Sequence, residues 1–214
     1  ALALALLAAP DLYAQTNYWW DSNDSTAGFG TAQGTWAAPT TNNATQGWTT
    51  DNTGSTTMSG STTIGNDNIN FGTSTNQLGT GTITISGNVS ARLINFTASS
   101  SNITLSGGNI SLGTSSAITV TNSANTSAIT QAISSNITLG ASPGWTVNNG
   151  GTVGTATLSV SGNVTGGSYG LTKSGNGTLI LSGAANSWNG TTTVSGGTMT
   201  LSGSLTTNNS VSLS

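Results

Sequence analysis

The run from Gly170 to Gly203 constrains the fold most, because it holds three short segments of alternating apolar and polar residues, each closed by Ser-Gly or Gly-Gly. Such alternation is typical of β-strands with one buried face. The Ser-Gly pair recurs at intervals of 20 or 21 residues, at positions 86, 106, 161, 182 and 202 apart from one longer gap. A period near ~20 residues predicts a solenoid, in which each coil buries its apolar side chains by stacking on the next.

We therefore predict an all-β protein, a right-handed parallel β-helix (β-solenoid) with an aromatic-rich N-terminal cap. The β-helix is expected over residues 59–214, where segments such as 82–85 (TITI) and 157–160 (TLSV) alternate and helical periodicity is absent. Glycine and asparagine are expected at the corners, where φ turns positive. Residues 114–154 are the least regular part, which predicts longer loops or a distorted coil there.

Residues 15–58 differ from the rest of the chain because they concentrate large aromatic side chains. This segment contains Tyr18, Trp19, Trp20, Phe29, Trp36 and Trp48. The first coil of a solenoid exposes core side chains and unpaired strand edges unless something covers it. We therefore predict that 15–58 form the N-terminal cap.

Charge is almost absent, at 3% of residues, with a net charge of -3. Nucleic acid is excluded as a partner, since neutralising phosphates requires clustered basic residues and Arg92 and Lys173 stand apart. With five acids and two bases, stability is expected to vary little between about pH 4.5 and 9. There is no cysteine, so disulfide and thiol chemistry are excluded.

Candidate catalytic groups are few, because the chain contains neither His nor Glu. General acid–base chemistry would fall mainly to Asp21, Asp24, Asp51 and Asp67, which do not form a cluster in the sequence. We predict that the protein is not an enzyme and that it has no catalytic residue, cofactor or metal site. The oxygen-rich segment 21–25 (DSNDS) lacks the glycine and glutamate of an EF-hand loop, which favours an Asx turn over a calcium site.

The N-terminal residues carry features of an export signal, and the C-terminal residues suggest that the chain continues. Residues 1–9 are apolar, Pro10 breaks the run, and Ala14 is a small residue acceptable to signal peptidase. We predict that 1–14 are a truncated signal peptide, the alternative being a first apolar element of the fold. The last residues stop inside a new alternating segment, which suggests that the sequence is part of a longer protein.

Exposed tryptophans can stack on sugar rings, so we consider a carbohydrate-binding module as the alternative function. The candidate ligand-contact residues are Trp19, Trp20, Trp36, Trp48 and Trp188. For Trp188, packing over a turn is favoured over sugar binding.

A family resemblance rests on 170–183 (GLTKSGNGTLILSG) followed by Asn186, Trp188, Val194 and Met199. This run resembles the passenger-associated strand repeat of bacterial autotransporters, with Trp188 where that repeat usually has Tyr and Met199 where it has Leu. The resemblance, at about 170–203, implies a secreted or outer-membrane-associated passenger of a Gram-negative-type bacterium. It implies structural or adhesive, non-catalytic function. The partners it implies are a host or environmental surface, with glycans as one class, and an outer-membrane barrel or anchor beyond Ser214.

Overall fold

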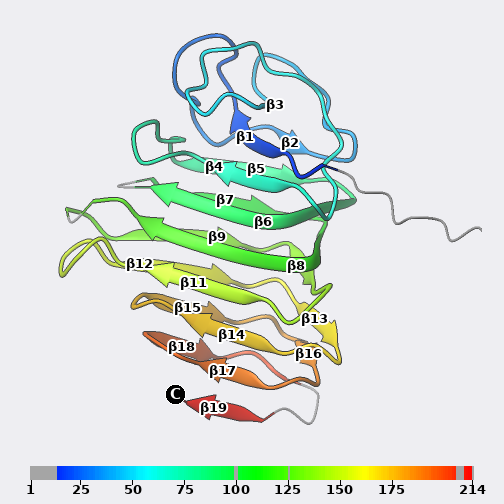
Figure 1. Ribbon diagram of the computed structural model, residues 1–214, viewed down its shortest axis with the longest axis vertical. Helices are drawn as coiled ribbons and strands as arrows, with labels where there is room; N and C mark the ends of the chain where they lie inside the picture. Colours follow the sequence, from blue (N-terminus) through cyan, green and yellow to red (C-terminus); the bar gives the residue numbers. More distant parts are fainter. Residues whose placement is uncertain (1–13, 99–100, 125, 206–209, 214) are drawn as a thin grey trace, which may run out of the picture.

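The computed structural model describes residues 14–98, 101–124, 126–205 and 210–213, so the predicted signal peptide lies almost entirely outside the described residues. All regular elements in these ranges are β-strands, which confirms the all-β prediction. The strands stack along one axis, with β1 near one end and β19 at the other (Figure 1). No helix in the described part of the chain is long and apolar enough to cross a membrane. The molecule is a β-solenoid.

The first sheet has 12 strands, and all but one of its pairings are parallel. Its main path runs through β19 (Val211–Leu213), β17 (Thr192–Val194), β14 (Leu171–Ser174), β11 (Gly144–Asn148), β8 (Asn109–Asn122), β6 (Asn88–Ala98), β4 (Asn68–Phe71), β1 (Asn17–Asp21) and β3 (Gly47–Thr49). A branch consists of β10 (Asn136–Thr138), β13 (Val164–Gly167) and β16 (Ser187–Trp188). The branch arises because β8 is long: its first half pairs with β10 and its second half with β11. Each coil in this region therefore contributes to the first sheet twice, once in the main path and once in the branch.

The second sheet closes the remaining face with 7 strands. They are β18 (Thr198–Leu201), β15 (Thr178–Leu181), β12 (Ala156–Val160), β9 (Ile129–Ile133), β7 (Ile103–Ser106), β5 (Gly81–Ile85) and β2 (Thr35–Trp36). Every pairing in this sheet is parallel. Parallel pairing between strands about one coil apart is what the repeated segments predict.

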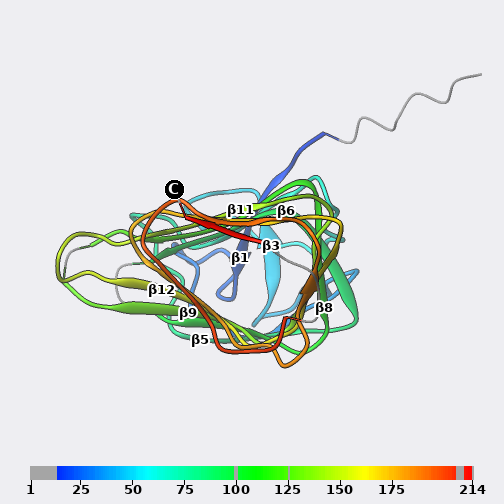
Figure 2. The ribbon, with the colours of Figure 1, turned by 90° about the horizontal axis from the view of Figure 1, so that it is seen from below.

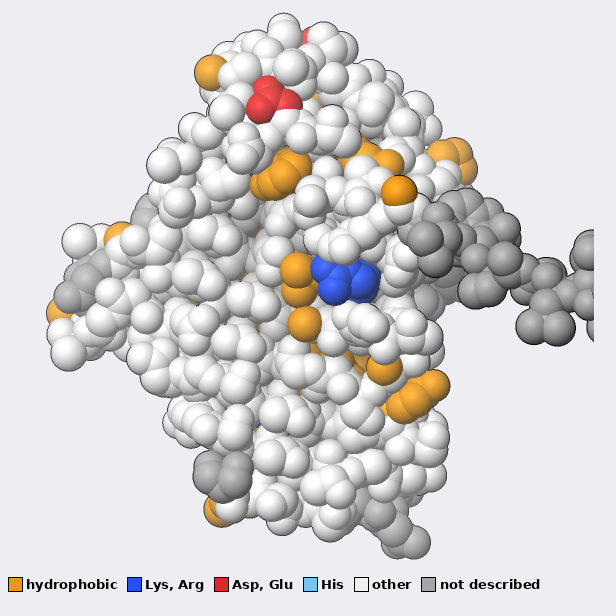
Figure 3. Space-filling view, in the orientation of Figure 1, with side chains coloured by type: hydrophobic (Ala, Val, Ile, Leu, Met, Phe, Trp, Pro, Cys, Tyr) orange, Lys and Arg blue, Asp and Glu red, His pale blue; other side chains and the backbone are white. Residues whose placement is uncertain are grey.

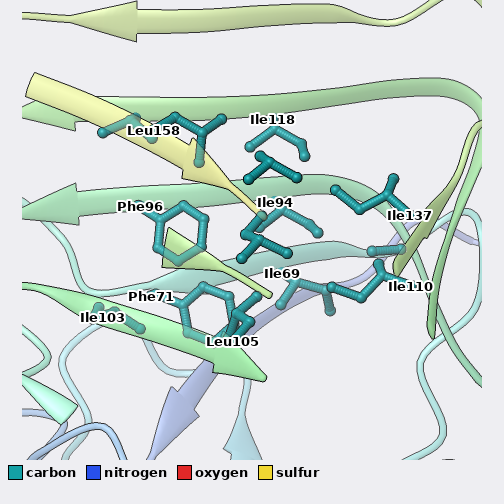
Figure 4. Close-up of a cluster of buried hydrophobic side chains, with 14 of the residues drawn as sticks. Ile69, Phe71, Ile94, Phe96, Ile103, Leu105, Ile110, Ile118, Ile137 and Leu158 are labelled. Carbon is teal, nitrogen blue, oxygen red and sulfur yellow. The ribbon is translucent and has the colours of Figure 1, made fainter. Parts of the chain in front are cut away.

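Apolar side chains stack on like side chains from coil to coil, and this register forms the core (Figure 4). Ile69 pairs with Ile94, and Ile94 pairs with Ile118. The rings of Phe71 and Phe96 stack with centroids 5.0 Å apart. Because each inward side chain is covered by its equivalents above and below, a thin coil gains a continuous buried column.

The number of residues per coil varies more from coil to coil than the regular period in the sequence predicts. Leu181 pairs with Leu201, 20 residues further on, but Leu105 pairs with Ile133, 28 residues further on. The additional residues of the middle coils lie in connections that project sideways, such as the one between β11 and β12 (Figure 2). The prediction of longer loops within 114–154 is therefore confirmed.

Asparagines occupy one corner, as expected. Asn109 pairs with Asn88 on one side and Asn136 on the other. The Asn136 side-chain oxygen accepts a hydrogen bond from the Asn163 backbone N–H at 3.0 Å. These bonds join successive coils without charged groups, and little charge is visible on the face in Figure 3.

The aromatic-rich segment covers the N-terminal end of the column. Its strand β1 pairs in parallel with β4, and β3 then adds to β1 in the antiparallel direction. Two antiparallel bridges, Thr40 to Ser61 and Trp48 to Ser59, link it to the residues after position 58. An antiparallel edge strand ends the parallel stack, which is the arrangement expected of a cap.

Candidate functional site

Four of the five predicted ligand-contact residues lie in the core. Trp20, Trp36, Trp48 and Trp188 are 0% exposed, and only Trp19 is half-buried. A ring that stacks on a sugar must present one open face to solvent, and these four rings have none. The carbohydrate-binding hypothesis is therefore corrected for Trp20, Trp36 and Trp48, which are packing residues, and the burial of Trp188 agrees with the packing that was favoured for it.

The tryptophans of the cap contact one another and the first coils. Trp48 packs edge-on against Trp20, with ring centroids 4.8 Å apart, and against Trp36 at 5.5 Å. Trp36 in turn lies 6.3 Å from Phe71, the first ring of the stacked pair in the core. The cap and the solenoid therefore share one continuous apolar cluster.

Each buried indole N–H in this set has an acceptor. Trp36 donates to the Thr63 hydroxyl and Trp48 to the Thr40 hydroxyl, both at 3.1 Å. Trp188 donates to the Thr192 hydroxyl at 2.9 Å. Because a buried N–H without an acceptor destabilises a fold, these bonds are what structural tryptophans require.

The aspartates close local turns and tie loops together. Asp51 accepts hydrogen bonds from the backbone N–H groups of Thr53 at 2.9 Å and Ser55 at 3.0 Å, which holds the pKa of its carboxyl below the usual range. Asp67 accepts one from the Ile64 N–H at 2.9 Å. In the described ranges, no group of three or more acidic side chains is placed to hold a metal ion.

The segment 21–25 forms the Asx turn that the sequence favours. The Asp21 carboxylate accepts a hydrogen bond from the Asn23 backbone N–H at 2.9 Å. Asp21 is fully buried, and its second oxygen, Oδ2, has no hydrogen-bond partner among the described protein atoms. Burial, reinforced by the nearby charges of Asp24 and Asp51, raises the pKa of Asp21 from the ordinary 3.8 to about 6.

Lys173 is a buried residue whose role we did not predict. Its ammonium group donates to the carbonyl oxygens of Ser174 at 2.7 Å, Gly175 at 2.9 Å and Gly196 at 3.0 Å. Burial lowers its pKa. The signal was present in the alternation of β14, where Leu171 and Lys173 share the inward face. Lys173 therefore connects its own turn to the turn of the next coil.

Asn186 makes the corresponding connection to the preceding coil. Its side-chain oxygen accepts a hydrogen bond from the Val164 N–H at 2.9 Å, and its side-chain NH₂ donates to the Gly183 carbonyl at 2.9 Å. Asn186 therefore bonds the segment from β14 to β18 to the preceding coil, whereas Lys173 joins two coils within that segment.

The comparison with protein families matches this same unit. Residues 171–201 match the family model described as passenger-associated-transport-repeat. These residues are similar to such a repeat. The repeat begins with β14 and ends with β18, and it contains both Lys173 and Asn186. No curated protein and no solved structure matches the chain.

Proposed function

We propose that this protein is a non-catalytic structural and adhesive passenger of the autotransporter type, secreted from or displayed on the surface of a Gram-negative-type bacterium. The observation that carries the proposal is the match of 171–201 to the passenger-associated-transport-repeat, in a segment whose strands pair in register with the preceding coil and with β19 of the next. A repeat that bonds to the coil on each side suits a long shaft built from many such units.

The chemistry of the shaft supports a passive role outside the cell. Its stability depends on backbone ladders and stacked apolar side chains, and only 3% of residues are charged. Such a structure needs neither disulfides nor ion pairs, so it is little affected by the redox state or salt content of its surroundings.

The aspartates support the absence of catalysis. Asp24, Asp51 and Asp67 all accept hydrogen bonds from backbone N–H groups that fix loops. Groups used in this way are occupied as structural acceptors, and the buried Asp21 belongs to an Asx turn.

The test uses the source bacterium with and without the gene. We expect the protein to be cleaved by protease added to intact cells or to be recovered from the medium, and we expect deletion to lower attachment to abiotic or host-cell surfaces. Restoring the gene should restore attachment. Protease resistance on intact cells together with absence from the medium would refute the location, and unchanged attachment would refute adhesion.

A further inference from the structure

A groove of about 290 Å³ lies where β10 and β13 run side by side on the branch of the first sheet. It is lined by Thr138 and Leu139 from one coil and by Thr165 and the turn 166–169 from the next. None of the lining side chains is charged.

A β-bulge produces the groove. The pairing of β13 with β16 shifts register between Thr165 and Gly167, and Gly167 has a φ of 53°. Gly166 fits closely, because a Cβ added there would lie 2.8 Å from Leu139 Cδ1. Bulges re-aim the side chains that follow them, and here the chain turns outward before it continues into β14.

The outward turn presents Tyr169. The Tyr169 backbone N–H donates to the Gly166 carbonyl at 2.9 Å, which closes the turn. The Tyr169 side chain is 38% exposed, more than any other aromatic side chain in the part of the chain that the structure describes. Tyr169 therefore exposes aromatic surface beside the groove, which the buried tryptophans do not.

Hydroxyl groups face the groove from two successive coils. Thr165 Oγ1 lies 3.5 Å from Thr138 Oγ1, and the two residues pair in register. Their backbones are one strand spacing apart, about 4.8 Å, which is comparable to the length of a pyranose residue in an extended chain. Thr138 Oγ1 donates to Asn109 Oδ1 at 3.2 Å and Thr165 Oγ1 donates to the Ile137 carbonyl at 3.4 Å, so both hydroxyls keep lone pairs with which to accept hydrogen bonds from sugar hydroxyls.

We propose that this groove binds a neutral saccharide chain, with the Tyr169 ring stacking on one sugar and the hydroxyls of Thr138 and Thr165 bonding to its neighbour. Polar hydroxyls beside an aromatic ring suit a ligand that is apolar on its ring faces and polar at its edges. An anionic sugar would lose solvation in a groove that holds no positive charge, so the neutral class is favoured. The inference deepens the proposed adhesive function by naming the ligand class.

The test measures binding of the purified chain to cellohexaose, mannohexaose and chitohexaose by titration calorimetry, with an oligogalacturonate as the charged comparison. We expect at least one neutral hexasaccharide to bind and the oligogalacturonate not to bind. Tyr169→Ala should weaken binding by about tenfold or more, and Tyr169→Phe should retain most of it because the ring is kept. Thr165→Val should weaken it through the lost hydroxyl.

The matched control is Val153→Ala, since Val153 is 60% exposed in a different loop. It should bind as the unmodified chain does, and circular dichroism should show that all variants keep their β-structure. No binding of any neutral hexasaccharide, or equal binding by Tyr169→Ala, would overturn the proposal. If deleting the gene lowers attachment but a strain carrying Tyr169→Ala attaches normally, the saccharide site is refuted and the adhesive function stands. Tyr169-dependent binding without any effect of deletion on attachment would refute the adhesive function alone.

Discussion

The Lys173 ammonium donates a hydrogen bond to the Gly196 carbonyl oxygen, 3.0 Å away and one coil further along the chain. Burying an ammonium removes it from water, which destabilises the charged form and lowers its pKa. Two further carbonyl acceptors, of Ser174 and Gly175, offset that loss. The bond therefore fixes the relative position of two successive coils inside the repeat.

Replacing Lys173 by Met should destabilise the protein by about 1–3 kcal/mol, because three carbonyl oxygens lose their donor while the apolar volume is largely kept. Urea denaturation followed by circular dichroism measures the loss. Thr172→Ser is the matched control, since Thr172 is exposed on the opposite face of the same strand. Equal stability of the two variants would mean that the ammonium bonds contribute nothing net.

Stability should fall as pH rises through the range between 3.8 and about 6, because of Asp21. In that range the folded protein keeps the Asp21 proton more firmly than the unfolded chain does, so removing it costs folding free energy on the order of 3 kcal/mol. This single buried carboxyl is an exception to the weak pH dependence that the low charge predicts. Melting temperatures measured from pH 4 to 8 test it.

Asp21→Asn should abolish the fall in stability between pH 3.8 and about 6, since the amide side chain does not titrate. Asp51→Asn is the informative comparison, because the lowered pKa of Asp51 has the opposite consequence: its stabilisation is present at neutral pH and is lost as pH falls. A chain carrying Asp21→Asn that keeps the original pH profile would show that another group is responsible.

The buried and half-buried tryptophans of the cap should differ in their importance for stability. Trp48→Ala should cost about 3–5 kcal/mol, since the ring is fully buried against Trp20 and Trp36 and donates to Thr40. Trp19→Ala should cost clearly less because Trp19 keeps part of its surface in water. Chemical denaturation of both variants under the same conditions measures the difference, and equal losses would contradict the assignment of Trp48 to the core.

The sequence was sufficient to predict the strands and their stacking, because alternation in segments such as 82–85 directly reflects which side chains face inward. It was not sufficient to assign the tryptophans, since whether a ring stacks on a sugar or packs against Phe71 depends on residues far away in the chain. Lys173 escaped notice because a charged residue is expected outside, although its position in the alternation was inward. The groove beside Tyr169 depends on a bulge. A register shift between two coils produces no periodic pattern in the sequence, so the groove could not be predicted from it.

Deleting residues 15–58 should make the remaining chain associate. The deletion removes β1 from the edge of β4 and removes Trp36 from the ring of Phe71, so an unpaired strand and an apolar surface both become exposed. We expect the β-signal in circular dichroism to persist largely, because the coils after β4 keep their own pairings, while light scattering reports oligomers or aggregates. The full chain at the same concentration is the reference. A stable monomer after deletion would show that the aromatic-rich segment is not needed to cover the first coil, and it would overturn its assignment as a cap.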